Sequence, residues 1–173
     1  MKKAKRITYL REIEIRYKPY KAAGDISGTR ITGPEVAAQL FQDLQNETKE
    51  KFIVISLDGA HKIICFEVVA IGSANTIGLK PFQVFRTSIV VNSVSQIVIH
   101  NHPSGELDPS DADKKFTEKL LYFCKESGLN LLDHIIIGYK GHFSFAAEGL
   151  MFSLFSLASK KRKRKTSSRK KAK

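Results

Sequence analysis

The chain has 173 residues, which suits a single domain with a sizeable core. Its formal net charge is +12, but ten Lys and Arg residues lie in residues 160–173 without any acid, so the rest of the chain carries only +2. No apolar run approaches the roughly 20 residues that cross a bilayer, and the basic start lacks the apolar segment of a secretory signal. Cys65 and Cys124 lie in separate apolar patterns, which favours buried free thiols over a disulfide. These features exclude a membrane or secreted protein and predict a cytoplasmic one.

Hydrophobic periodicity divides the chain into three regions. Residues 1–30 combine a basic start with a strand-like segment and a loop, residues 31–158 have the patterns of a globular domain, and residues 159–173 form a basic tail. The patterns predict strands over residues 7–16, 50–58, 62–70, 96–101, 129–137 and 142–146, and helices over residues 34–46, 81–92 and 109–127. This alternation indicates an α/β protein with helices packed on a mixed sheet.

Cap and turn residues mark the ends of several elements. Thr32, followed three residues later by Glu35, predicts that a Thr side chain caps the first helix. The Asp58-Gly dipeptide between two apolar runs predicts a β-hairpin, with a turn longer than two residues. Gly128 predicts the end of the third helix.

The most informative stretch runs from the strand at residues 96–101 into the third helix. This strand carries His100 and His102, whose side chains project from one face because they are two residues apart. A Pro-Ser-Gly turn follows, and Ser110 and Asp113 then begin the helix. Two imidazoles and one carboxylate give three protein ligands, the number typical of a catalytic zinc ion that keeps its fourth position for water. We therefore predict one Zn²⁺ per chain on His100, His102 and Asp113.

Each part of this motif also has a simpler explanation. Histidines at a strand end often bond loop carbonyls, and Ser110 with Asp113 fits a helix capping box in which the carboxylate bonds backbone and no metal. The string His-Asn-His also invites comparison with HNH nucleases, but their motif residues are dispersed through a hairpin and a helix. The joint spacing of all four residues favours the metal site.

The spacing His-x-His-x7-Ser-x2-Asp resembles the JAMM metal motif of the JAB/MPN fold, and the surrounding sequence resembles its RadC branch. The similarity extends over residues 34–150 and is strongest in residues 100–113, 132–138 and 143–149. The resemblance implies the α-β-α sandwich of MPN domains, shared in outline with cytidine deaminases. It also implies hydrolysis of peptide or isopeptide bonds. RadC proteins have, however, traditionally been labelled DNA repair proteins, so the resemblance does not choose the substrate.

The resemblance implies roles for two further residues. In the family, a Glu near an early strand takes a proton from the metal-bound water, and Glu50 occupies the matching position before an apolar strand. Ser110 is implied to hydrogen-bond the oxyanion or the water. Glu50 can also be explained as one of several charges at a helix end, and Ser110 as the helix cap.

The chain departs from the RadC pattern in two places. Phe82 and Gln83 stand where RadC sequences usually have an Arg-Glu pair, so we expect a different substrate or partner if that pair makes contacts. The chain also shows no counterpart of the N-terminal helix-hairpin-helix region of long RadC proteins, and it resembles the short, single-domain branch.

The other histidines, and the acids near the motif, are not expected to be metal ligands. His134 follows Asp133 in an apolar strand and is predicted to be a core histidine, with support of the metal ligands as the less favoured alternative. We expect His61 and His142 at the surface. Glu106 and Asp108 are expected to be solvated.

The basic tail has too few apolar residues to fold alone. Besides aiding solubility, residues 160–173 are predicted to bind nucleic acid without base specificity, because they have no aromatic side chain for stacking. A localisation signal would have the same composition. The tail also lacks apolar anchors for a membrane. The apolar segment at residues 150–157 is expected to pack as a terminal helix or to bind a partner.

The sequence therefore supports three hypotheses. The first is a zinc-dependent hydrolase of metallopeptidase type with an unknown substrate, in which Glu50 activates the metal-bound water. The second is a DNA-associated repair or recombination factor whose metal site is not catalytic and whose tail does the binding. The third, a metal-dependent nuclease, combines the two.

Overall fold

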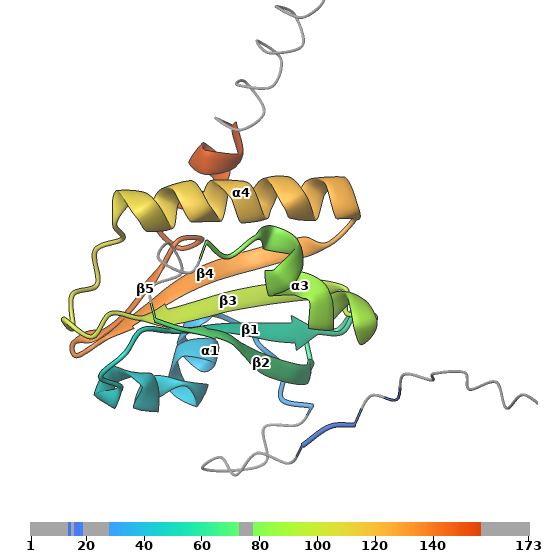
Figure 1. Cartoon of the computed structure of the whole chain (residues 1–173), viewed down its shortest axis with the longest axis horizontal. Coiled ribbons are helices and arrows are strands. Elements are labelled where there is room, and N and C mark those ends of the chain that lie inside the picture. Colours follow the sequence, from blue (N-terminus) through green and yellow to red (C-terminus); the bar gives the residue numbers. More distant parts are fainter. Residues whose placement is uncertain (1–13, 15, 19–27, 73–77, 157–173) are drawn as a thin grey trace, which may run out of the picture.

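The computed structural model describes residue 14 and residues 16–18, 28–72 and 78–156. Five strands form one twisted sheet in the order β2-β1-β3-β4-β5 (Figure 1). The strands are β1 (Lys51–Leu57), β2 (Ile63–Ile71), β3 (Ser95–Asn101), β4 (Asn130–Gly138) and β5 (Gly141–Ser144). The β3–β4 pair is parallel and the other three pairs are antiparallel, so the sheet is mixed.

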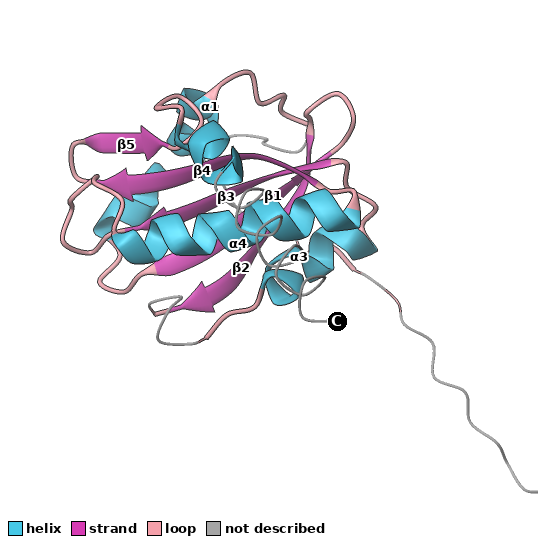
Figure 2. Cartoon of the chain, turned by 90° about the horizontal axis from the view of Figure 1, so that it is seen from above, coloured by secondary structure: helices cyan, strands magenta, loops and turns pink. Residues whose placement is uncertain are grey.

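Helices cover both faces of this sheet. They are α1 (Pro34–Leu40), the 3₁₀ helix η1 (Gln42–Asn46), α3 (Pro81–Val90) and α4 (Asp111–Ser127), and residues 150–156 are also helical. Figure 1 shows α4 and α3 above the sheet and α1 below it, and Figure 2 shows α4 lying across the strands. The molecule is thus a three-layer α-β-α sandwich, which confirms the predicted fold class.

Strand alternation creates two separate cores. In β3, Ile97 and Ile99 pack on the α1 face, whereas Val98 packs on the α4 face. His100 follows the same alternation and therefore faces α4. Helix α4 buries Phe116 and Leu120 against the sheet and contributes to this second core. The metal motif thus lies between the sheet and α4.

Helix α4 has well-defined ends. The Ser110 hydroxyl accepts a hydrogen bond from the Asp113 backbone N–H, and the Asp113 side chain accepts one from the Ser110 N–H, so the two residues form a capping box. The helix ends at Gly128, whose φ of 74° lies in the left-handed region that favours glycine. Both ends agree with the sequence prediction.

Other predicted elements were corrected in detail. The expected helix over residues 34–46 is broken at Phe41 into α1 and η1, and Thr32 does not cap it, because the N-cap is Gly33 and has no side-chain hydrogen bond. The hairpin turn is longer than two residues, as expected, and the Asp58 carboxylate organises it by accepting from the backbone N–H groups of Ala60 and Lys62.

Several predictions fall on segments that the structure does not describe. The strand expected at residues 7–16 lies outside the described residues except for Glu14 and Arg16, which belong to no regular element. The basic tail at residues 160–173, predicted to bind nucleic acid, also lies outside them. Its role and the cytoplasmic location stay predictions. Among the described helices, none combines the length and apolar character that crossing a bilayer requires.

Both cysteines are free thiols, as predicted. Cys124 is buried in α4, and Cys65 is half-buried in β2. Burial raises the pKa of the Cys124 thiol to about 12, so this side chain acts as a small apolar group in the core.

Candidate metal centre

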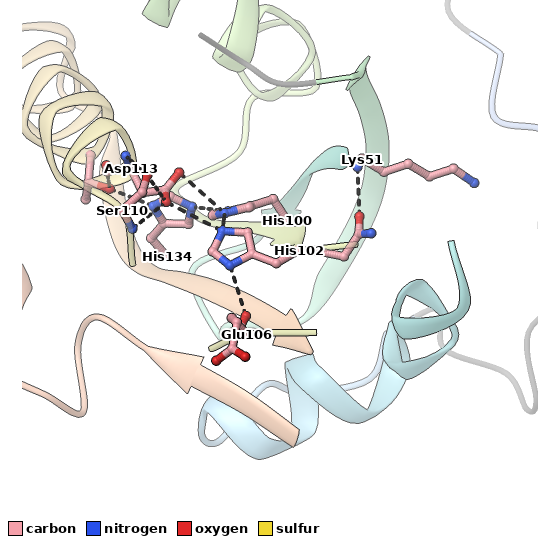
Figure 3. A network of polar contacts seen from close by, with 9 residues as sticks. Lys51, His100, His102, Glu106, Ser110, Asp113 and His134 are labelled. Atoms are coloured by element: carbon pink, nitrogen blue, oxygen red, sulfur yellow. Dashed lines mark hydrogen bonds and ion pairs between the residues drawn. The ribbon is translucent and has the colours of Figure 1, made fainter. Parts of the chain in front are cut away.

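Three predicted ligands meet where β3 ends and α4 begins. The Nε2 atoms of His100 and His102 lie 3.0 Å apart. Asp113 reaches them from α4: its Oδ1 lies 3.5 Å from His100 Nε2 and its Oδ2 lies 3.5 Å from His102 Nε2. Figure 3 shows the two imidazoles converging on the Asp113 carboxylate. The fold therefore brings together the residues that the spacing predicted as a ligand set.

His102 is oriented by the loop between β3 and α4. Its Nδ1 lies 2.9 Å from the backbone carbonyl oxygen of Glu106, and a carbonyl can only accept, so Nδ1 carries the proton (Figure 3). In the neutral ring Nε2 then has a free lone pair directed at Asp113. Contact with Asp113 raises the pKa of His102, against the effect of burial, and the negative charge of Glu50 adds to the rise.

The loop that carries this carbonyl is fixed to β4. The His102 backbone N–H donates to the Ile137 carbonyl, and the Tyr139 N–H donates to the Gly105 carbonyl. Gly105 has a φ of 79°, and a Cβ there would lie 2.0 Å from the Tyr139 ring. Only glycine fits both this backbone conformation and this contact. The Pro-Ser-Gly turn therefore places the Glu106 carbonyl under His102.

His100 lies deeper than His102. Its side chain is fully buried and is stacked with Phe52 at a centroid distance of 6.0 Å. Burial lowers its pKa to about 4, so the ring is neutral at pH 7. Its Nδ1 lies 2.8 Å from Nε2 of His134, leaving Nε2 to face the ligand cluster.

The position of Asp113 suits both of the roles that the sequence presented as alternatives. Its Oδ2 accepts from the Ser110 backbone N–H at 2.8 Å and from the Ser110 hydroxyl at 2.6 Å, while both oxygens face the imidazoles. Burial opposes ionisation, but hydrogen bonding by His102, the charge of His100 and the two Ser110 bonds together lower the Asp113 pKa well below its usual range. Capping and ligation are compatible, because the helix start aims the carboxylate at the histidines.

The donor set fits a small tetrahedral cation. Zinc binds nitrogen and oxygen ligands at about 2.0–2.2 Å, and a tetrahedron of such bonds has edges of about 3.3 Å. The two Nε2 atoms are 3.0 Å apart, and each lies 3.5 Å from an oxygen of Asp113, His100 from Oδ1 and His102 from Oδ2. One ligand atom from each residue therefore lies within 4.8 Å of the other two. When both rings are neutral, the set directs two ring lone pairs and the carboxylate oxygens at one point, an arrangement that a bound cation stabilises.

Glu50 lies directly before β1, beside the end of β3. It is half-buried, and its charge acts on His102, so the structure places it next to the ligand cluster. The side chain of the fully buried Asn101 holds the backbone on both sides of it. Asn101 Oδ1 accepts from the Lys51 N–H at 2.8 Å, and Asn101 Nδ2 donates to the Lys49 carbonyl at 3.2 Å. Asn101 thereby fixes the position of Glu50 relative to the adjacent histidines.

Other predicted residues have less direct connections to the cluster. The Ser110 hydroxyl is engaged with Asp113, and its implied contact with an oxyanion stays a prediction. Gln83 accepts a hydrogen bond from the Lys80 N–H and so caps α3, while Phe82 is exposed beside it. Three of the remaining candidates are exposed, namely His61, Glu106 and Asp108. The fourth, His142, is half-buried.

Sequence reasoning gave too little weight to one supporting residue of the site and missed two others. His134 was expected mainly as a core histidine, and it is buried, but its Nε2 contacts His100. Thr117 and Asn101 were not considered. Thr117 lies four residues after Asp113 and so shares its helix face, a signal that was available in the sequence. The position of His134 depends on the β3–β4 register, which the sequence does not provide.

The fold and the ligand cluster define a class of protein. A model of the RadC-like JAB domain matches residues 31–150, and the chain belongs to this family. This result confirms the resemblance to the RadC branch of the JAB/MPN fold.

Individual relatives agree with the family. A UPF0758 protein of Aquifex aeolicus is 36% identical over 149 residues, covering 86% of this chain and 62% of the relative. UPF0758 proteins of Methanosarcina acetivorans and Methanosarcina mazei are 41% and 40% identical over 123 residues, covering 70% of this chain and 54% of each relative. The chain thus spans little more than half the length of these curated relatives.

Proposed function

We propose that this domain is a zinc-dependent hydrolase that cleaves a peptide or isopeptide bond. The observation that carries the proposal is the convergence of His100, His102 and Asp113 beside a half-buried glutamate, Glu50. Membership of the RadC-like JAB domain family supports it, because JAB domains include metallopeptidases that cleave isopeptide bonds.

The proposed chemistry divides between the ion and the protein. Zinc, when bound, would make a water molecule more acidic and polarise the substrate carbonyl. The carboxylate of Glu50 accepts a proton from the attacking water as the water oxygen bonds to the carbonyl carbon. The protonated Glu50 then transfers this proton to the leaving nitrogen as the C–N bond breaks. The carboxyl group returns to its ionised form after one cycle.

The protein's own contacts suit this cycle. Glu50 must keep its place while it gains and loses a proton, and the two Asn101 hydrogen bonds hold the backbone that carries it. His102 is exposed on one side, where a substrate can approach, while His100 is enclosed by the core.

The first test is metal content. The protein would be purified without added metal and analysed for zinc, as wild type and as the His100→Ala/Asp113→Ala variant. We expect close to one zinc per chain in the wild type and none in the variant. The control variant, His142→Ala/Asp111→Ala, removes the same residue types outside the cluster and should keep its zinc. A wild type that neither contains zinc nor binds added zinc would overturn the proposal.

The second test concerns the reaction. The zinc-loaded protein would be incubated with peptide and isopeptide-linked substrates and with DNA, and products would be identified by mass spectrometry. Cleavage at a C–N bond, lost in Glu50→Gln, is the expected result. DNA cleavage that depends on His102 would replace the proposal by the nuclease hypothesis.

A further inference from the structure

A chain of buried hydrogen bonds runs from the backbone of α4 to the ring of His100. The Thr117 hydroxyl donates to the Asp113 carbonyl oxygen at 2.7 Å and lies 2.6 Å from His134 Nδ1. The other nitrogen of this ring, Nε2, lies 2.8 Å from His100 Nδ1. Thr117, His134 and His100 are fully buried, so these contacts are not shared with bulk water.

The direction of each bond follows from the first one. A carbonyl oxygen has no proton, so the single proton of the Thr117 hydroxyl is used in the bond to Asp113. The hydroxyl must then accept from His134, whose Nδ1 carries the proton. In a neutral ring Nε2 of His134 is therefore an acceptor, and Nδ1 of His100 must donate to it. The proton of His100 is thus fixed on Nδ1, and its Nε2 presents a lone pair to the ligand cluster.

The opposite direction conflicts with the geometry. If Thr117 donated to His134, two oxygen atoms would face each other at 2.7 Å without a proton between them. His134 would then protonate its Nε2, and His100 would carry its proton on the nitrogen that faces His102, where it blocks a metal ion. The hydrogen bonds therefore couple the tautomer of His100, through His134 and Thr117, to the backbone carbonyl of Asp113.

Aromatic rings keep His134 in the orientation that this chain needs. Phe145 stacks on its ring at a centroid distance of 4.7 Å, and Phe52 meets it edge-on at 5.7 Å. A ring flip would place carbon atoms against Thr117 and His100 and leave buried polar atoms unpaired, which is costly in a core. The His134 ring is therefore held between a donor, Nδ1 of His100, and an acceptor, the Thr117 hydroxyl.

We propose that Thr117 and His134 are positioning residues that hold His100 in its metal-binding tautomer. The inference rests on the proposed zinc function. It adds the contacts that keep His100 able to bind the ion. Neither residue is itself one of the candidate ligands, and both act through His100. The proposal predicts that a hydroxyl on α4 that bonds the backbone of Asp113, and none of the candidate ligand atoms, affects metal affinity.

The test compares three variants with the wild type in zinc competition against a chelator. Thr117→Val removes the hydroxyl but keeps the shape of the side chain, and we expect zinc affinity to fall about tenfold, the lower end of the range for outer-shell partners. Thr117→Ser restores a hydroxyl and should restore the affinity. Ser88→Ala is the matched control, because it removes a buried hydroxyl that pairs with Ser56 at 2.8 Å in another part of the core. It should destabilise folding comparably and leave zinc affinity unchanged.

A second measurement needs no variant. In the zinc-loaded wild type, ¹⁵N NMR of the histidine rings should show His134 protonated on Nδ1, the less common tautomer of free histidine. A proton on Nε2 of His134 would overturn the proposal.

The outcomes separate this inference from the proposed function. If the wild type binds zinc and Thr117→Val binds it equally well, the positioning role is wrong while the zinc site stands. If the wild type binds no zinc, the proposed function fails and the inference fails with it. Weak binding in Thr117→Val together with full binding in Thr117→Ser and Ser88→Ala supports the inference.

Discussion

The two faces of the sheet are built from the same strands but differ in kind. The core on the α1 face is built around a cluster of apolar residues, among them Ile55, Ile97 and Ile99, and the buried amide of Asn101 follows it along β3. The α4 face contains an apolar core too, but His100 and His134 take sheet positions in it. Adjacent residues of one strand, such as Ile99 and His100, therefore belong to different physical environments.

This difference shows how one sheet separates folding from chemistry. Burying an apolar side chain is favourable wherever it packs well, whereas a buried polar group is tolerated only if a partner meets it at the right distance and angle. On the α4 face each buried histidine has such a partner. Substitutions on the α1 face should therefore act on stability through packing, whereas the α4 face also depends on specific polar atoms.

The largest expected effect tests whether the polar face performs chemistry. Glu50→Gln should lower kcat by about 10²–10⁴-fold, because the amide cannot accept the proton of the water. Zinc content and thermal stability should stay at wild-type values. Glu47→Gln is the matched control, since Glu47 pairs with Lys51 at 2.6 Å on the neighbouring turn. Equal activity in both variants would remove Glu50 from the mechanism.

The next effect tests the apolar face. Ile55 is fully buried in β1, and Ile55→Ala should lower the free energy of unfolding by about 2–5 kcal/mol through lost burial and a cavity. Zinc affinity of the folded protein should not change, because the side chain points away from α4. Val68→Ala, at a position that is 41% exposed, should cost much less. Chemical denaturation and chelator competition measure the two quantities separately. A matching loss of zinc affinity would show that the faces are coupled.

Asn101 tests the boundary between the faces. It occupies the α1-face position after Ile99, yet its amide holds the segment that carries Glu50. Asn101→Ala should cost about 1–3 kcal/mol of stability through buried groups left unpaired. It should also lower kcat more than it changes KM or zinc affinity. Asn130→Ala, at an exposed position, is the control. Unchanged kcat in folded Asn101→Ala would limit Asn101 to a structural role.

The smallest effect concerns Asp133, a buried carboxylate next to His134. Burial raises its pKa above the ordinary value of 3.8, although the Ser144 hydroxyl and the backbone N–H groups of Ala146 and His134 donate to it. The folded protein therefore holds this proton more tightly than the unfolded chain. Its contribution to stability is present below pH 3.8 and is lost as the pH rises through the folded pKa.

The measurement is the difference in unfolding free energy between wild type and Asp133→Asn from about pH 3 to pH 7. As the pH rises, the wild type should lose stability relative to Asp133→Asn. Asp58→Asn should show the opposite sign, because the Lys62 backbone N–H, with other contacts, lowers the Asp58 pKa. A pH-independent difference for Asp133→Asn would contradict the expected shift.

Local patterns predicted much of the fold. The β-branched runs at β1, β3 and β4 and the Gly after α4 marked elements that the structure contains. The break at Phe41 was missed, because a single apolar stripe does not distinguish a continuous helix from an α-helix followed by a 3₁₀ turn. The capping role of Thr32 was wrong because the chain enters the helix at Gly33.

The sequence by itself determined the ligand set. His100, His102 and Asp113 lie within 14 residues of one another, and strand alternation and helix capping are local rules that bring their side chains to one side. Only the tertiary structure decided which residues support them. The contact of His134 with His100 depends on the register of β3 and β4, and the hydrogen bond from Lys51, beside Glu50, to Asn101 joins residues 50 positions apart. Such contacts depend on long-range pairing and packing, which a pattern within one segment does not encode.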